Sequence, residues 1–230
     1  MKKLFEGWTP FEIVLFLSGQ IVTFVIGIIN RSNPFALIAG AFNICNAILS
    51  AKGRVANYYF GIIGNLIYSI ISFQNRYYSE VITNFLIVMP ISFYGLYNWI
   101  KRRREGKEEE VKIATLTTKE ILIPILSQVV LSVPYYYMLK YFNTDMLVIS
   151  TFSMIATILA FYFMAKASEI FYVFFILSAV PKIAFWIVPL FHGDTRNIPL
   201  LISNIVYLVN DIYGLYNWLK MKKEQKETNA

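Results

Sequence analysis

Long apolar stretches separated by short polar segments make up most of this chain of 230 residues. Lipid offers the backbone no hydrogen-bond partners, so a stretch that crosses a membrane must be helical. A helix needs about 20 residues to cross the hydrocarbon core. The stretches cover roughly residues 10–29, 34–51, 56–74, 79–100, 120–140, 144–165, 169–190 and 198–219. This pattern predicts an all-α polytopic membrane protein with about eight transmembrane helices in a single membrane domain, 1–230.

The composition excludes an ordinary soluble domain. Hydrophobic residues make up 57% of the chain and charged residues 15%, whereas soluble domains average about 45–50% and about 25%. No small-residue cleavage site follows the first apolar stretch, so we interpret residues 10–29 as a retained helix and not as a signal peptide.

The positions of the lysines and arginines predict the orientation in the membrane. An even number of spans places both termini on one side, and cytoplasmic loops are rich in basic residues. With eight spans, 16 basic residues fall on the side of the termini and 4 on the other. We therefore predict a bacterial cytoplasmic (inner) membrane protein with both termini in the cytoplasm. The net charge of +7 is then an orientation signal and gives no reason to expect nucleic-acid binding.

A nine-residue motif near the end of each half of the chain reveals an internal repeat. Residues 93–101 are FYGLYNWIK and residues 212–220 are IYGLYNWLK, identical at seven of nine positions with an offset of 119. Ala51-Lys52 and Ala165-Lys166 form a fainter match at an offset of 114. Basic residues follow both copies, so both leave the membrane on the same side, as parallel repeats do.

The repeat predicts two parallel three-helix units, 34–100 and 144–219. Three spans reverse the direction of the chain, so one more span must link the units if both are to run the same way. The other segments are an extra N-terminal helix at 10–29, a charged, solvated cytoplasmic linker at 101–119, the linking helix at 120–140 and a cytoplasmic tail at 220–230.

The aromatic residues of the repeated motif precede basic residues, which is typical of side chains at a membrane–water interface. We interpret them as an interfacial belt of Tyr94, Tyr97, Trp99, Tyr213, Tyr216 and Trp218. In an alternative interpretation, Tyr94 and Tyr213 face a cavity between the two units. Gly95 and Gly214 are expected to let helices approach closely.

Polar residues inside the predicted spans are candidates for substrate contact, because lipid penalises them. Helical spacing places Asn65, Ser69 and Ser72 on one face of the third span, and Asn204, Tyr207 and Asp211 on one face of the last. Lys182 lies within the seventh span and needs compensation. It could form a structural ion pair with Asp211, contact a ligand, or extend to the outer interface.

No catalytic or metal-binding constellation stands out. His192, the single histidine, lies in a predicted outer loop without the partners of a catalytic triad. The chain contains neither an HExxH motif nor a Gly-rich phosphate loop. Cys45 is the single cysteine and cannot form a multi-cysteine site. We therefore predict that the protein is not an enzyme and has no metal or cofactor.

The runs SAKGRVANYYFGIIGNLIYSIISFQNRYYSEVITNFLIVMPISFYGLYNWIKR and YLVNDIYGLYNWLK resemble the PnuC vitamin transporters of bacteria. The resemblance covers residues 34 to 220 and implies three-plus-one-plus-three helices, as in the sugar-carrying SWEET proteins. It also implies facilitated diffusion of an unphosphorylated, nucleoside-like vitamin, above all nicotinamide riboside, by alternating access. A cytosolic kinase would then trap the substrate.

The resemblance also suggests a substrate site. The family's ligand motif has Asn-Trp, a second Trp three residues later, and a polar residue four further on. It corresponds here to a stretch starting at Asn57-Tyr58, and in the second unit to Ile170-Phe171, Phe174 and Ser178. Phe171 and Phe174 would stack on the ligand ring. The predicted substrate-binding residues are Asn57, Tyr58, Asn65, Tyr68, Phe171, Phe174, Ser178, Lys182, Asn204, Tyr207 and Asp211.

Other functions stay open at this point. The same fold could carry a deoxynucleoside, thiamine or riboflavin, because the tryptophans of the motif are replaced here. A membrane-embedded enzyme subunit would need an acid, base or metal cluster, and a sensor or scaffold would need a large soluble domain. Few acidic residues lie in the spans, which favours transport without ion coupling. The sequence is compatible with a monomer and with a homo-oligomer.

Overall fold

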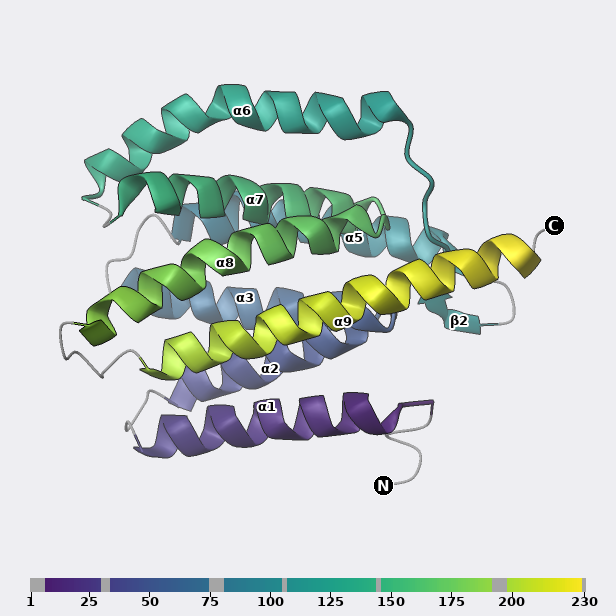
Figure 1. Cartoon of the computed structure of the whole chain (residues 1–230), viewed down its shortest axis with the longest axis horizontal. Helices are drawn as coiled ribbons and strands as arrows, with labels where there is room; N and C mark the ends of the chain where they lie inside the picture. The colour runs from purple at the N-terminus through teal and green to yellow at the C-terminus, as the bar shows by residue number, and fades with distance from the viewer. Residues whose placement is uncertain are drawn as a thin grey trace.

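The computed structural model describes residues 7–29, 34–74, 81–104, 107–143, 146–191 and 198–228. A helix occupies each of the predicted apolar stretches (Figure 1). The helices are α1 (Pro10–Ile29), α2 (Pro34–Ala51), α3 (Asn57–Gln74), the π-helical η1 (Ile82–Val88), which continues into α5 (Met89–Lys101), α6 (Thr118–Tyr141), α7 (Leu147–Ala165), α8 (Ile170–Phe191) and α9 (Ile198–Thr228). Two short strands, β1 (Arg103–Arg104) and β2 (Lys107–Val111), lie between α5 and α6.

The helices have the character of membrane spans. Within the described residues, three helices, α1, α6 and α7, are both long and apolar enough to cross a membrane. Apolar helices of shorter length occupy Leu37–Ala51 and Ile170–Pro181. Outward-facing side chains are apolar too: Val130 on α6 is 72% exposed and Ile28 on α1 is 70% exposed. Hydrocarbon accepts such a surface, whereas water penalises it.

Six helices pack in a ring, each against two neighbours, in the order α2, α3, α5, α7, α8, α9 and back to α2. The ring thus contains two sets of three helices in chain order, α2–α3–α5 and α7–α8–α9. Outside the ring, α1 packs against α2 and α9, and α6 packs against α7. These two helices lie at opposite edges of the bundle (Figure 1). We call the end of the ring where residues 102–117 connect α5 to α6 the linker end.

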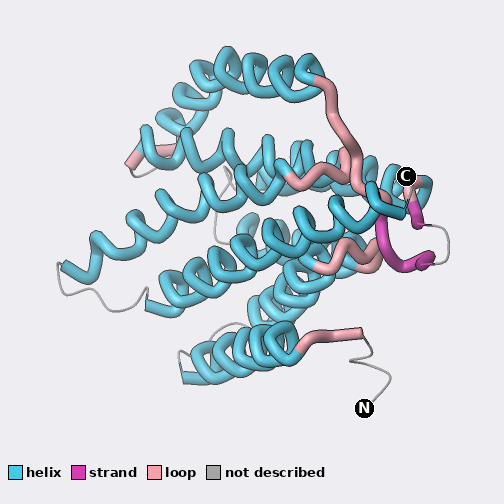
Figure 2. Tube along the Cα trace, turned by 45° about the vertical axis from the view of Figure 1, so that its right-hand side comes forward, coloured by secondary structure: helices cyan, strands magenta, loops and turns pink. Residues whose placement is uncertain are grey.

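The connection between α5 and α6 is more ordered than a solvated linker. Its two strands form an antiparallel hairpin near the C-terminal end of the chain (Figure 2). The N–H of Val111 donates to Gly53 O at 2.9 Å, and the N–H of Ala114 donates to Ala167 O at 2.8 Å. Val111 is fully buried and Ala114 nearly so. The prediction of a solvated linker is therefore wrong for Val111, Ile113 and Ala114, which are buried. The N–H groups of Val111 and Ala114 bind the turns after α2 and α7.

Much of the predicted tail at 220–230 is helical, because α9 continues to Thr228. Ion pairs at helical spacing support this extension: Lys220–Glu224 and Lys223–Glu227. The side chain of Gln225 accepts a hydrogen bond from Ile113 N–H at 2.9 Å and donates one to Val111 O at 3.1 Å. The last turns of α9 are thereby joined to the linker.

Candidate functional site

The turns after α2 and α7 have the same backbone conformation. Gly53 and Ala167 have positive φ angles of 64° and 56°. The N–H of Gly53 donates to Ser50 O and that of Ala167 to Met164 O, each at 2.9 Å. A left-handed residue of this kind ends a helix and satisfies one of its last carbonyls. The two turns lie 114 residues apart, at the offset of the fainter sequence match.

The motif at the end of α5 binds the end of α7. The indole Nε1 of Trp99 donates to Met164 O at 2.6 Å, and the amide Nδ2 of Asn98 donates to Ala165 O at 2.7 Å. The last carbonyls of an α-helix have no partner within the helix. Asn98 and Trp99 supply donors from a different set of three helices, and Met164 O accepts the indole bond in addition to the bond from Ala167 N–H.

The motif at the end of α9 makes the same contacts with the end of α2. Trp218 Nε1 donates to Ser50 O at 2.9 Å, and Asn217 Nδ2 donates to Ala51 O at 2.8 Å. The donors lie 119 residues after Asn98 and Trp99, and the acceptors lie 114 residues before those on α7. Each set of three helices therefore closes the helix end of the other.

Four aromatic side chains form a buried layer at the linker end. Trp99 and Trp218 meet at 5.4 Å between ring centroids; Tyr58 lies edge-on to Trp99 at 5.1 Å, and Tyr172 lies edge-on to Trp218 at 6.2 Å. We call Tyr58, Trp99, Trp218 and Tyr172 the aromatic layer. None of the four is more than 3% exposed. Such edge-to-face contacts add to the energy of burial.

Two glycines make this layer possible. A Cβ atom at Gly95 would overlap the ring and hydroxyl of Tyr58, and one at Gly214 would overlap Tyr172. The predicted role of both glycines in close helix approach is confirmed.

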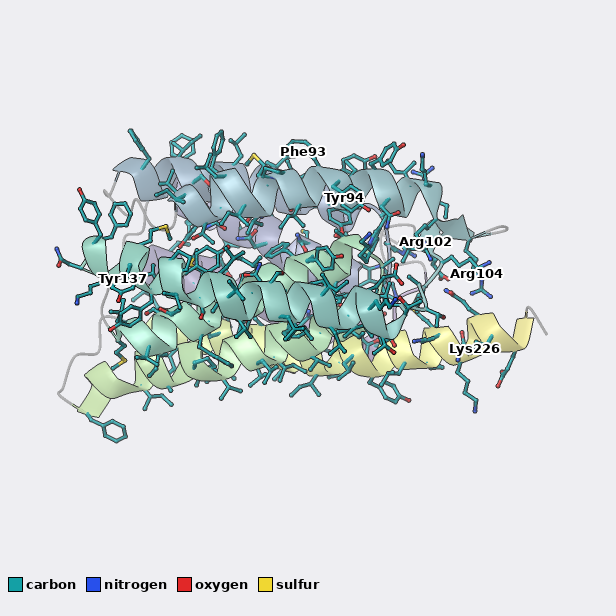
Figure 3. The ribbon with its side chains drawn as sticks, turned by 90° about the horizontal axis from the view of Figure 1, so that it is seen from above. Phe93, Tyr94, Arg102, Arg104, Tyr137 and Lys226 are labelled. Atoms are coloured by element: carbon teal, nitrogen blue, oxygen red, sulfur yellow. The ribbon has the colours of Figure 1, made fainter. Side chains whose placement is uncertain are left out.

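The interfacial belt is only partly correct. Trp99 and Trp218 are fully buried, so the prediction is wrong for them, because their N–H groups bind helix-end carbonyls. Tyr94, Tyr97 and Tyr216 are exposed, as a belt requires. In Figure 3, Arg102, Arg104 and Lys226 lie toward the linker end, and Tyr137 lies at the other end of the molecule.

The two layer tyrosines differ at their hydroxyl groups. The Tyr172 hydroxyl shares a hydrogen bond with the Ser50 hydroxyl at 3.3 Å. The equivalent of Ser50, 114 residues later, is Met164, which offers no hydroxyl. The Tyr58 hydroxyl and the Oδ1 atom of Asn57 are buried without a hydrogen-bond partner among the described residues. Buried polar atoms are normally satisfied, so these two are the clearest candidates for contact with a ligand.

The structure corrects the alignment of the second unit. Tyr172, and not Phe171, is the counterpart of Tyr58, because each packs against the glycine of its own motif and the edge of a motif tryptophan. Phe171 is fully buried and lies edge-on to Trp218 at 4.9 Å. Phe174 stacks on Phe163 at 5.4 Å. Both rings already pack against protein, and their stacking on a ligand stays a prediction.

The remaining predicted residues lie farther from the linker end. Asn65 and Ser178 follow Tyr58 and Tyr172 by seven and six residues, which corresponds to about 10 Å along a helix. Asp211 interacts electrostatically with Tyr172 and Tyr207. The hydroxyl of Ser178 donates to Phe175 O of its own helix at 2.9 Å. The predicted site residues are thus found at two depths, with Asn57, Tyr58 and Phe171 at the linker end.

Three further predictions concern side chains around the ring. Tyr68 is 39% exposed, and Asn204 is half-buried. Lys182 belongs to α8, but its side chain lies outside the described residues, so the predicted pair with Asp211 stays a prediction. Glu169, which directly precedes α8, forms an ion pair with Lys222.

Sequence reasoning missed the helix-closing role of Asn98, Trp99, Asn217 and Trp218, although the repeated motif contains all four. It also missed Tyr172. The signal that could have found them is the repeat itself, because identical residues at equivalent helix ends can bind equivalent carbonyls.

A groove of about 470 Å³ lies between α6 and α7, outside the ring. Its lining comes from Ser132, Val133, Tyr136, Tyr137, Val148, Thr151, Phe152 and Ile155. None of the predicted substrate-binding residues lines it, so we place the candidate site within the ring. In the part of the chain that the structure describes, no group of three or more His, Cys, Asp or Glu residues could hold a metal ion.

Comparison with known proteins identifies relatives over nearly the whole chain. A protein of Neisseria mucosa named nicotinamide riboside transporter PnuC is 30% identical over 228 residues, which cover 96% of this chain and 86% of the relative. A protein of the same name from Haemophilus influenzae is 27% identical over 222 residues, which cover 95% of this chain and 93% of the relative.

A solved structure also matches. The crystal structure of the vitamin B3 transporter PnuC has a TM-score of 0.80 and 28% sequence identity, and the match covers 97% of both chains. The family described as nicotinamide mononucleotide transporter matches residues 33–220, which include the ring, the aromatic layer and both copies of the motif. The resemblance to PnuC proteins is confirmed, and the chain belongs to the nicotinamide mononucleotide transporter family.

Proposed function

We propose that this protein is a membrane transporter that takes up nicotinamide riboside and has no enzymatic activity. The observation that carries the proposal is the match of two proteins named nicotinamide riboside transporters to 96% and 95% of this chain. The ring, with buried unpaired polar atoms at one end, is consistent with a site for a polar small molecule.

We further propose that the ring consists of two parallel three-helix units, α2–α3–α5 and α7–α8–α9, with α6 as the linking helix and α1 as an extra helix. Support comes from contacts that occur twice at constant sequence offsets, namely the turns after α2 and α7 and the bonds from the Asn-Trp pairs. In this proposal the linker end faces the cytoplasm, because most basic residues fall on that side.

The substrate would bind along the axis of the ring, outward of the aromatic layer. The nicotinamide ring of the riboside carries a positive charge, which the carboxylate of Asp211 can complement. The Tyr58 hydroxyl, in the layer itself, and Asn57 Oδ1, at the linker-end start of α3, supply unpaired hydrogen-bonding groups that the substrate would meet as it reaches the layer. Asn65, Ser178, Asn204 and Tyr207 complete the proposed polar surface, with Lys182 and Tyr68 as further candidates. Stacking by Phe171 and Phe174 would require these rings to leave Trp218 and Phe163.

Transport would be facilitated diffusion by alternating access. The substrate would be unphosphorylated. Phosphorylation by a cytosolic kinase would trap it and maintain the inward concentration gradient of the unphosphorylated substrate. Another carried ligand, such as thiamine, riboflavin or a deoxynucleoside, is the alternative.

A ligand panel tests this proposal. The purified protein is heated with nicotinamide riboside, nicotinamide mononucleotide, thiamine, riboflavin or a deoxynucleoside, and Tm is measured. Ligand that binds the folded state alone stabilises it by about 2.7 kcal/mol at 100 times Kd, so we expect Tm to rise by several degrees with the riboside.

The mononucleotide is the informative competitor, because the family description names it whereas the relatives are named for the riboside. A rise in Tm with the mononucleotide alone would overturn the proposal that the substrate is unphosphorylated. A rise with another vitamin alone would favour the alternative ligand.

A further inference from the structure

Four side-chain hydrogen bonds from the repeated motif cross between the two sets of three helices at the linker end. Asn98 and Trp99 of α5 donate to α7, and Asn217 and Trp218 of α9 donate to α2. We call these four residues the cross-lock. In chain order, each donor pair belongs to one set of three helices and its acceptors to the other.

The acceptors of the cross-lock are helix-end carbonyls. Ser50 and Ala51 end α2, and Met164 and Ala165 end α7, where no later turn of the helix supplies donors. Both indole N–H groups are buried with their acceptors. If the two sets of helices separated here, the indole and amide donors would need water as a replacement partner, whereas Ser50 O and Met164 O would keep their bonds from the N–H groups of Gly53 and Ala167. The bonds can therefore break at low cost only when water enters the linker end.

The two halves of the cross-lock are in direct contact. The rings of Trp99 and Trp218 meet at 5.4 Å, and both residues are 0% exposed. Tyr58 packs on the other side of Trp99, and Tyr172 packs on the other side of Trp218. The two tryptophans therefore lie at the centre of the aromatic layer.

We propose that the cross-lock is the gate at the linker end of the transport path and is closed in this structure. Release of substrate into the cytoplasm then requires both Asn-Trp pairs to leave their carbonyls. The repeated motif holds the two helix sets together in the closed state, and its loss shifts the protein toward the open state. This inference rests on the proposed transport function.

Access of a thiol reagent from the cytoplasmic side tests the gate without any substrate. Ser92 lies on α5 seven residues before Trp99, on the same helix face, and is 4% exposed. In a background without the native thiol (Cys45→Ala), Ser92→Cys places a reporter beyond the gate. Inside-out vesicles are treated with a charged, membrane-impermeant thiosulfonate, and the labelling rate of the reporter is measured.

Trp99→Phe and Trp218→Phe keep a large ring but remove the N–H donor. Each is expected to raise the labelling rate about fivefold to tenfold, which corresponds to the net contribution of one buried hydrogen bond. Asn98→Ala and Asn217→Ala remove the other two donors and are expected to raise the labelling rate about threefold to fivefold. They serve as the test if a tryptophan variant does not fold. Tyr216→Phe alters an exposed tyrosine of the same motif and should leave the rate unchanged.

Unchanged labelling in all four donor variants would overturn the gate, as would an equal increase in Tyr216→Phe. The thermal-shift panel is separate: failure of the riboside to bind would refute the proposed function and leave the labelling result intact. If the gate is correct, the folded donor variants bind ligand but transport it at an altered rate.

Discussion

Two tyrosines in equivalent positions have different surroundings, and the difference lies in one neighbouring residue. Ser50 gives the Tyr172 hydroxyl a partner at 3.3 Å, whereas its equivalent near Tyr58 is Met164. The first unit therefore contains a buried hydroxyl with no described partner. A buried unpaired polar group lowers the free energy of unfolding. We therefore expect such a group to be kept where it binds a ligand.

Replacing each tyrosine by phenylalanine separates the two roles. Tyr172→Phe should lower the free energy of unfolding by about 1 kcal/mol, because it loses the bond to Ser50. Tyr58→Phe should leave the stability of the free protein unchanged or slightly raised, but weaken riboside binding about threefold to tenfold. Thermal unfolding with and without riboside measures both effects. Equal losses of stability, or unchanged affinity in Tyr58→Phe, would contradict this assignment.

At the scale of elements, the spacing between helices depends on the glycines of the motif. Gly95 lets α3 approach α5 through Tyr58, and Gly214 lets α8 approach α9 through Tyr172. In both places an aromatic ring occupies the volume where a Cβ atom would lie. The same device therefore sets the packing of the middle helix against the last helix in each set.

Gly95→Ala and Gly214→Ala should both destabilise the fold. Overpacking typically costs about 1–3 kcal/mol, which for a chain of this size lowers Tm by roughly 2–12 °C. Gly19→Ala is a matched control, because its Cβ would meet Ile44 at 3.4 Å. We expect the Tm of Gly19→Ala to fall much less than that of the two motif variants. Full thermal stability in both motif variants would show that the tyrosines can move aside freely.

At the scale of the whole molecule, α1 is attached to the ring by a buried carboxylate. Glu12 is 2% exposed; it accepts hydrogen bonds from Lys52 at 2.7 Å and from the Tyr213 hydroxyl at 2.8 Å. These partners follow α2 and lie on α9, the two helices against which α1 packs. The segment matched by the family begins at residue 33, after α1. This helix therefore supports the ring from outside.

Glu12→Gln should loosen α1 without abolishing ligand binding. Loss of the charged partner of Lys52 is expected to cost about 1–3 kcal/mol, visible as a lower Tm, while the riboside still raises Tm. Lys223→Gln is the control, because its pair with Glu227 is exposed and such pairs contribute about 0–1 kcal/mol. Loss of ligand binding in Glu12→Gln would instead make α1 part of the transport path.

The sequence by itself determined the apolar helices and the repeated motif. Apolar stretches near the thickness of a membrane can satisfy their backbone only as helices, and the offsets of 119 and 114 reappear in the contacts of the two motifs. It also indicated the family, because the motif residues and the polar residues of the third span are local patterns in the chain.

Only the tertiary structure decided what these residues touch. Periodicity cannot show that Trp99 reaches a carbonyl on α7 instead of the lipid interface, because that bond joins residues 65 positions apart. The burial of Val111 and Ala114 likewise depends on helix ends far away in the chain. A local pattern specifies which face of a helix is polar or aromatic, whereas the partner of that face is set by the closure of the ring.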